Sequence, residues 1–111
     1  MKLTLTAVLR KDKVNSNNQH PIIIRISYAN EKSRVGLGYS LELDKWESSS
    51  ETPNKKCEER IKREITNKIG EEKERIKDTF REYYQREGEF PTHQTLLALL
   101  KENKGRKNNE E

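Results

Sequence analysis

The sequence KLTLTAVLR (residues 2–10) begins the stretch that decides this fold, and PIIIRISYA (21–29) and KSRVGL (32–37) complete it. Apolar and polar residues alternate through the first segment, so that Leu3, Leu5 and Leu9 share one face. A period of two is typical of a β-strand with one buried face. Asn30 can adopt positive φ in a short turn between the second and third segments. The sequence therefore predicts a three-stranded antiparallel sheet.

The predicted sheet has one apolar and one polar face. Matching the alternation of the strands gives an apolar layer of Leu3, Leu5, Leu9, Ile22, Ile24, Ile26, Val35 and Leu37. The opposite layer contains Thr4, Thr6, Ile23, Arg25, Ser27, Lys32 and Arg34. A solvated face is normal for an antiparallel sheet. A solvated face with three cations, three hydroxyls and no carboxylate is less usual.

The charge of the chain is distributed unevenly. Residues 1–41 contain seven Lys or Arg and two Asp or Glu, a net charge of +5. Residues 42–111 contain 16 and 17, a net charge of −1. The positive excess of the chain therefore lies on its β part, which suits a small sheet that binds a phosphate backbone.

The remainder of the chain is predicted to be mostly helical, which makes the fold class α+β. A long helix is expected from about Lys55 to Arg86, with Asn54 or Thr52 as its N-cap and with its first half packed on the sheet. Trp46 is expected to plug one end of the core. The expected parts are the DNA-binding sheet at 1–48, a linker and the long helix at 49–88, a short helix capped by Thr92 at 89–101, and a disordered tail at 102–111.

Candidate residues for catalysis or metal binding are few. His20 and His93 have no closely spaced metal-ligand partner, and Cys57 lies on the apolar stripe of the long helix. We therefore expect no enzyme activity, cofactor or metal. A single cysteine, no signal peptide and no apolar run of about 20 residues together predict a cytoplasmic protein without a membrane partner.

The polar sheet face is the strongest candidate site, since the major groove of DNA can admit β-structure. Arginines there can read guanine or hold phosphate, short hydroxyls permit close approach, and flanking lysines can bind phosphates. The predicted contacts are Thr4, Thr6, Arg10, Lys11, Lys13, Ile23, Arg25, Ser27, Lys32 and Arg34. The alternative is a protein-interaction module that uses apolar surface of the long helix beyond the sheet.

The order of several short motifs also resembles a known family. The motifs are Leu9-Arg10, Pro21-Ile22, Arg25-Ile26, Leu37-Gly38, Ser40 and Trp46, followed by Phe90-Pro91-Thr92 before the short helix. This set resembles the N-terminal arm-type DNA-binding domain of Bacteroidetes phage and conjugative-transposon integrases, which are tyrosine recombinases. The resemblance covers about residues 2–101. The chain departs from the family pattern at Ile23, where an aromatic residue is usual, and at Asn30-Glu31, where Asn-Gly is usual.

The resemblance implies a non-catalytic module that binds arm-type DNA sites during integration and recombination. Its expected partners are double-stranded DNA and other integrase subunits, and no small-molecule substrate is expected. A core-binding domain and then the catalytic domain would follow the second helix in such an integrase, and both are expected to be absent here. Tyr83 and Tyr84 are accordingly expected to be packing residues and not the catalytic tyrosine.

Overall fold

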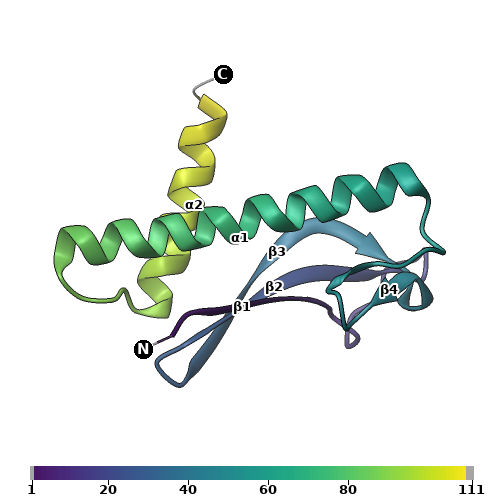
Figure 1. Ribbon diagram of the computed structural model, residues 1–111, viewed down its shortest axis with the longest axis horizontal. Coiled ribbons are helices and arrows are strands. Elements are labelled where there is room, and N and C mark those ends of the chain that lie inside the picture. The colour runs from purple at the N-terminus through teal and green to yellow at the C-terminus, as the bar shows by residue number, and fades with distance from the viewer. Residues whose placement is uncertain (1, 110–111) are drawn as a thin grey trace. The chain divides into compact units, whose positions relative to one another are not determined.

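The computed structural model describes the backbone of residues 2–109 and the side chains of residues 2–102 (Figure 1). Its elements are β1 (Thr4–Leu9), β2 (His20–Tyr28), β3 (Glu31–Leu41), the 3-10 helix η1 (Leu43–Lys45), β4 (Trp46–Glu47), β5 (Thr52–Pro53), α1 (Glu59–Glu87) and α2 (His93–Asn109). They form two compact units, Met1–Glu72 and Lys73–Glu111, whose boundary falls within α1. The predicted α+β class is confirmed.

The predicted three-stranded antiparallel sheet is also confirmed, with the strand order β1-β2-β3. The third strand is longer than expected, because β3 continues beyond Leu37 to Leu41. A two-residue turn joins β2 to β3, with φ of 55° at Ala29 and 63° at Asn30. Positive φ at both positions is the geometry of a type I′ turn, which matches the right-handed twist of the flanking strands.

The inner face of the sheet packs against the first half of α1, as predicted (Figure 1). Ile24 and Ile26 of β2 have no exposed surface, and neither does Ile65 of α1. The hydroxyl of Tyr39 on β3 donates a hydrogen bond to Glu64 Oε1 on α1, at 3.0 Å. The opposite face of the sheet is consequently the one that remains for a partner.

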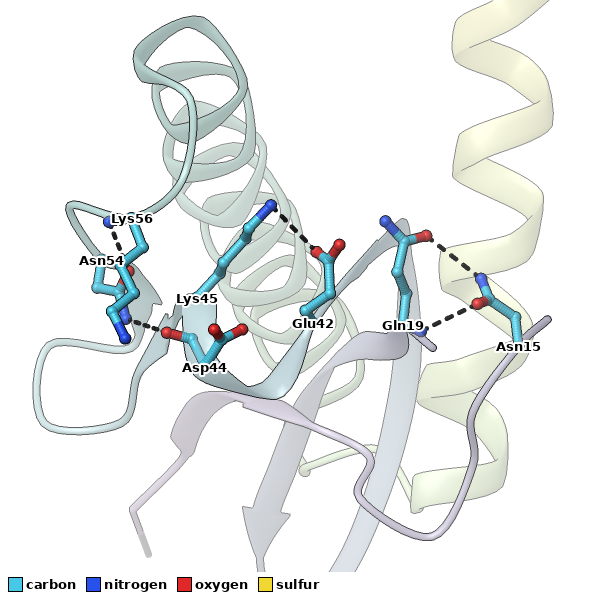
Figure 2. A network of polar contacts seen from close by, with 7 residues as sticks. All are labelled: Asn15, Gln19, Glu42, Asp44, Lys45, Asn54 and Lys56. Carbon is cyan, nitrogen blue, oxygen red and sulfur yellow. Dashed lines mark hydrogen bonds and ion pairs between the residues drawn. The ribbon is translucent and has the colours of Figure 1, made fainter. Parts of the chain in front are cut away.

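The start of α1 differs from the prediction. The Lys62 N–H donates to the Glu58 carbonyl, so Glu58 is the N-cap and neither Asn54 nor Thr52 caps the helix. Asn54 instead stabilises a turn, since its Oδ1 accepts from the Lys56 N–H at 2.9 Å (Figure 2). Its carbonyl also accepts from the Cys57 N–H, at 3.1 Å. Burial raises the pKa of the free Cys57 thiol, which is 6% exposed.

The second unit contains the last part of α1 and α2. Gly88 ends α1 with φ of 77°, a conformation that favours glycine, and its N–H donates to the Tyr84 carbonyl at 2.8 Å. Thr92 is the N-cap of α2, as predicted, because its Oγ1 accepts from the Thr95 N–H at 3.1 Å. α2 continues to Asn109. The expected disordered tail at 102–111 falls mostly on residues whose side chains are not described, and residues 110–111 lie outside the described backbone.

Candidate nucleic-acid interface

The outer face of the three-stranded sheet is built from three cross-strand rows. Across β1, β2 and β3 in turn, the strand register gives the rows Thr4–Ser27–Lys32, Thr6–Arg25–Arg34 and Val8–Ile23–Gly36. Side chains in such a row share one face of the sheet. The register thus places on one face seven of the ten residues that were predicted to contact DNA: Thr4, Thr6, Ile23, Arg25, Ser27, Lys32 and Arg34. We call this surface the outer face.

Two arginines lie directly opposite each other at the centre of the outer face. Arg25 and Arg34 are exposed, and their Cα atoms are paired across β2 and β3. The Cβ atoms of such a pair lie about 5 Å apart, and like charges in this position destabilise a sheet. Arg25 and Lys32 form no ion pair with any residue in the described part of the chain. The centre of the outer face is therefore a concentration of positive charge that an anion would stabilise.

One carboxylate, which belongs to a loop residue, lies beside the outer face. Asp12, in the loop after β1, accepts hydrogen bonds from Arg10 at 3.2 Å (Nε to Oδ1) and 2.7 Å (Nη2 to Oδ2). This hydrogen bonding holds the pKa of Asp12 below its ordinary value, with a smaller contribution from the charge of Arg34. Arg10 is thus already paired, whereas the neighbouring Lys11 is exposed and forms no ion pair with a described residue.

A groove runs along the β1 side of the outer face. Its lining includes Thr6, Val8, Arg10, Lys11, Asp12, Ile23, Arg25, Arg34, Trp46 and Ser48. Lys13 is exposed in the loop but does not line the groove. The groove therefore combines an apolar floor with a basic rim, and it contains both central arginines.

The short β4–β5 hairpin was not predicted from the sequence. Trp46 of β4 pairs with Pro53 of β5. Trp46 is half-buried and lines the groove, so it does not plug an end of the core as expected. Ile23 lines the same groove and is only 8% exposed, although the register places it on the outer face. Ile23 consequently offers less surface to a thymine methyl group than its position alone suggested.

One hydrogen bond joins this hairpin region to the edge strand β1. Glu51 Oε1 accepts from the Ala7 N–H at 3.0 Å, and Ala7 is 1% exposed. Glu51 has φ of 58°, a conformation that non-glycine residues seldom adopt. An edge strand presents backbone groups that need partners. Glu51 supplies such a partner and fixes the hairpin beside the groove.

The described residues contain no group of three or more His, Cys, Asp or Glu side chains that could hold a metal ion. In the same part of the chain, no helix is both long enough and apolar enough to cross a bilayer.

Comparison with protein families yields a match that covers most of the chain. The arm DNA-binding domain family matches residues 7–95, which includes the sheet apart from the first half of β1, the hairpin, α1 and the start of α2. The chain belongs to the arm DNA-binding domain family. This family is a non-catalytic DNA-binding module, so DNA is a partner of the chain, and the resemblance inferred from the sequence motifs is confirmed at this level. Comparison with curated proteins and with solved structures found no match.

Proposed function

We propose that this arm DNA-binding domain serves a tyrosine recombinase in DNA integration and recombination, and that it binds arm-type sites through its outer face. The observation that carries the proposal is the Arg25–Arg34 pair. The two guanidinium groups are held on adjacent strands without an ion-pair partner for Arg25. Phosphate oxygens, or the O6 and N7 acceptors of guanine, would relieve their mutual repulsion.

The dimensions of the sheet suit the major groove. Neighbouring strands lie about 4.8 Å apart, so three strands span roughly 10 Å between the outer backbones, whereas the groove is about 12 Å wide. Thr4 and Ser27 are short, which permits close approach of the backbone to base edges. Lys11, Lys13 and Lys32 would then bind phosphates at the rim of the groove.

Arg10 and Ile23 have more restricted roles in this proposal. Arg10 would have to share its guanidinium between Asp12 and a phosphate, because Asp12 already accepts two of its hydrogen bonds. Ile23 would form part of the apolar floor of the groove. Base reading would accordingly depend mainly on Arg25 and Arg34.

The test is the affinity of the domain for a labelled duplex, measured by fluorescence anisotropy at several salt concentrations. Arg25→Ala and Arg34→Ala should each weaken binding by about 1–3 kcal/mol, the range of a good base or phosphate contact. Arg63→Ala is the matched control, because Arg63 is exposed on α1 and does not line the groove. Equal affinities for the three variants would contradict binding through the outer face.

The alternative function, a protein-interaction module that uses the long helix, has less support. Among the described residues, Tyr84 is the only large apolar side chain of α1 that is exposed, at 45%. Its ring also stacks on Phe90, with centroids 4.6 Å apart. Light scattering on the wild-type domain and on Tyr84→Ala tests this alternative, which requires a concentration-dependent dimer that the substitution weakens.

A further inference from the structure

A second basic surface borders the β4–β5 hairpin. It is a pocket of about 370 Å³ whose lining includes Lys55, Lys56, Lys62, Glu47, Ser50 and Thr52. We call it the lysine pocket. Three ammonium groups face one carboxylate there, and the Glu47 carboxylate accepts a hydrogen bond from the Ser49 hydroxyl at 2.7 Å. The lysine pocket is thus net positive. Its two hydroxyls, Ser50 and Thr52, are hydrogen-bonded to each other at 2.7 Å, which leaves one O–H that can donate to an anion.

The lysines of this pocket are available to a ligand. Lys55 and Lys56 are exposed and Lys62 is half-buried. None of the three forms an ion pair with any residue in the described part of the chain. By contrast, Lys45, Lys68 and Lys77 elsewhere in the chain have carboxylate partners. The lysine pocket therefore gathers three ammonium groups whose charge no described carboxylate neutralises in an ion pair.

The segment that carries two of these lysines is held in place by Asn54. Its backbone N–H donates to the Lys45 carbonyl at 2.8 Å, and its Nδ2 donates to the Asp44 carbonyl at 2.8 Å. Its Oδ1 accepts from the Lys56 N–H at 2.9 Å, as Figure 2 shows. These bonds tie the lysine-bearing turn to η1. Less backbone freedom is then lost when a ligand binds, which favours affinity.

We infer that the lysine pocket binds a backbone phosphate of the same duplex that the outer face contacts, and this inference rests on the proposed function. The two surfaces border one hairpin, because Ser48 lines the groove and the preceding residue, Glu47, lines the lysine pocket. An ammonium group binds phosphate as a point charge and does not distinguish bases. The lysine pocket therefore strengthens binding to any duplex, whereas the central arginines provide sequence preference.

The experiment compares variants of the full chain in anisotropy titrations with an arm-site duplex and with a random duplex, each over a range of salt. The variant K55A/K56A/K62A removes the three pocket charges. Its matched control, R60A/R63A/K77A, removes three charges from positions on α1 that line neither the groove nor the lysine pocket. A third variant, K55R/K56R/K62R, retains the charges. Urea denaturation of each variant verifies that the fold is intact.

We expect K55A/K56A/K62A to lose at least about tenfold in affinity near 0.1 M salt on both duplexes. Its salt slope should fall by about 0.9, the value for one lost phosphate contact. The arginine-substituted variant should keep the wild-type slope. If the pocket variant matches R60A/R63A/K77A while Arg25→Ala still weakens binding, the lysine pocket binds no phosphate and the proposed function stands. If Arg25→Ala and Arg34→Ala also have no effect, the proposed outer-face interface itself is refuted.

Discussion

The hydrogen bond between the Glu51 carboxylate and the Ala7 N–H should stabilise the unit Met1–Glu72, which contains the sheet. Ala7 is 1% exposed, so the loss of its acceptor leaves a buried donor without a partner. Leaving a buried donor unsatisfied costs about 1–3 kcal/mol, and a hydrogen bond to a charged group contributes about 1.5–3 kcal/mol. We therefore expect Glu51→Ala to lower the free energy of unfolding by about 1.5–3 kcal/mol.

The substitution leaves the backbone strain unchanged, because glutamate and alanine meet a similar steric penalty at φ of 58°. Glu51→Gln retains an uncharged acceptor and should cost about half as much. Glu47→Ala is the matched control in the same hairpin, because Glu47 is exposed and its carboxylate bonds to the nearby Ser49 hydroxyl. It should change the free energy of unfolding by no more than about 0.5 kcal/mol.

Urea denaturation followed by the fluorescence of Trp46 suits this measurement, since Trp46 is the single tryptophan and lies in the hairpin. With a slope of roughly 1.5 kcal/mol per M of urea, the midpoint for Glu51→Ala should fall by about 1–2 M. A Glu51→Ala midpoint within about 0.3 M of the wild-type value, at an unchanged slope, would show that Ala7 does not depend on this acceptor.

Three further predictions concern the helices and the loop after β1. Gly70→Ala should raise the free energy of unfolding by about 1 kcal/mol in urea titrations, because alanine favours the helix more than glycine and the added Cβ meets no atom within 4 Å. Gly88→Ala should lower the free energy of unfolding, because φ at that position is 77°. Thr92→Ala should cost about 1 kcal/mol through loss of the α2 N-cap, measured as reduced helicity and thermal midpoint by circular dichroism. The pKa of Asp12, followed by carbon NMR, should lie below its ordinary value and should return towards that value in Arg10→Ala. Because folding lowers this pKa, the ionised carboxylate stabilises the folded state at pH values above the unfolded-state pKa. This stabilisation is lost as the pH falls through the folded-state pKa.

The sheet and its two faces could be predicted because strand periodicity determines them. The alternation along the three strands sufficed to place Thr6, Arg25 and Arg34 on one face, whereas their pairing in one row follows from the register of the structure. The N-cap at Thr92 was also predicted, since threonine before a helical pattern is a local signal.

The features that sequence reasoning missed depend on contacts between distant segments. Glu51 lies 44 residues from Ala7 along the chain, and no local pattern relates the two. Asn54 is a good N-cap residue, but its bonds to η1 and to the Lys56 N–H use it in a turn, so α1 begins later. Trp46 was assigned to the core on hydrophobicity alone, without knowledge of the β4–β5 pairing that places it in the groove.

The buried thiol of Cys57 allows local opening of the segment before α1 to be followed by chemical modification of the protein. Cys57 is the only cysteine, and it lies where the Asn54 turn leads into α1. Because a thiol-modifying reagent needs an accessible thiolate, and burial both shields this sulfur and raises its pKa, modification has to await opening of that junction. The labelling rate of the unmodified sequence therefore measures how often the segment beside the lysine pocket opens. A duplex that holds the segment closed would slow that rate without any introduced probe.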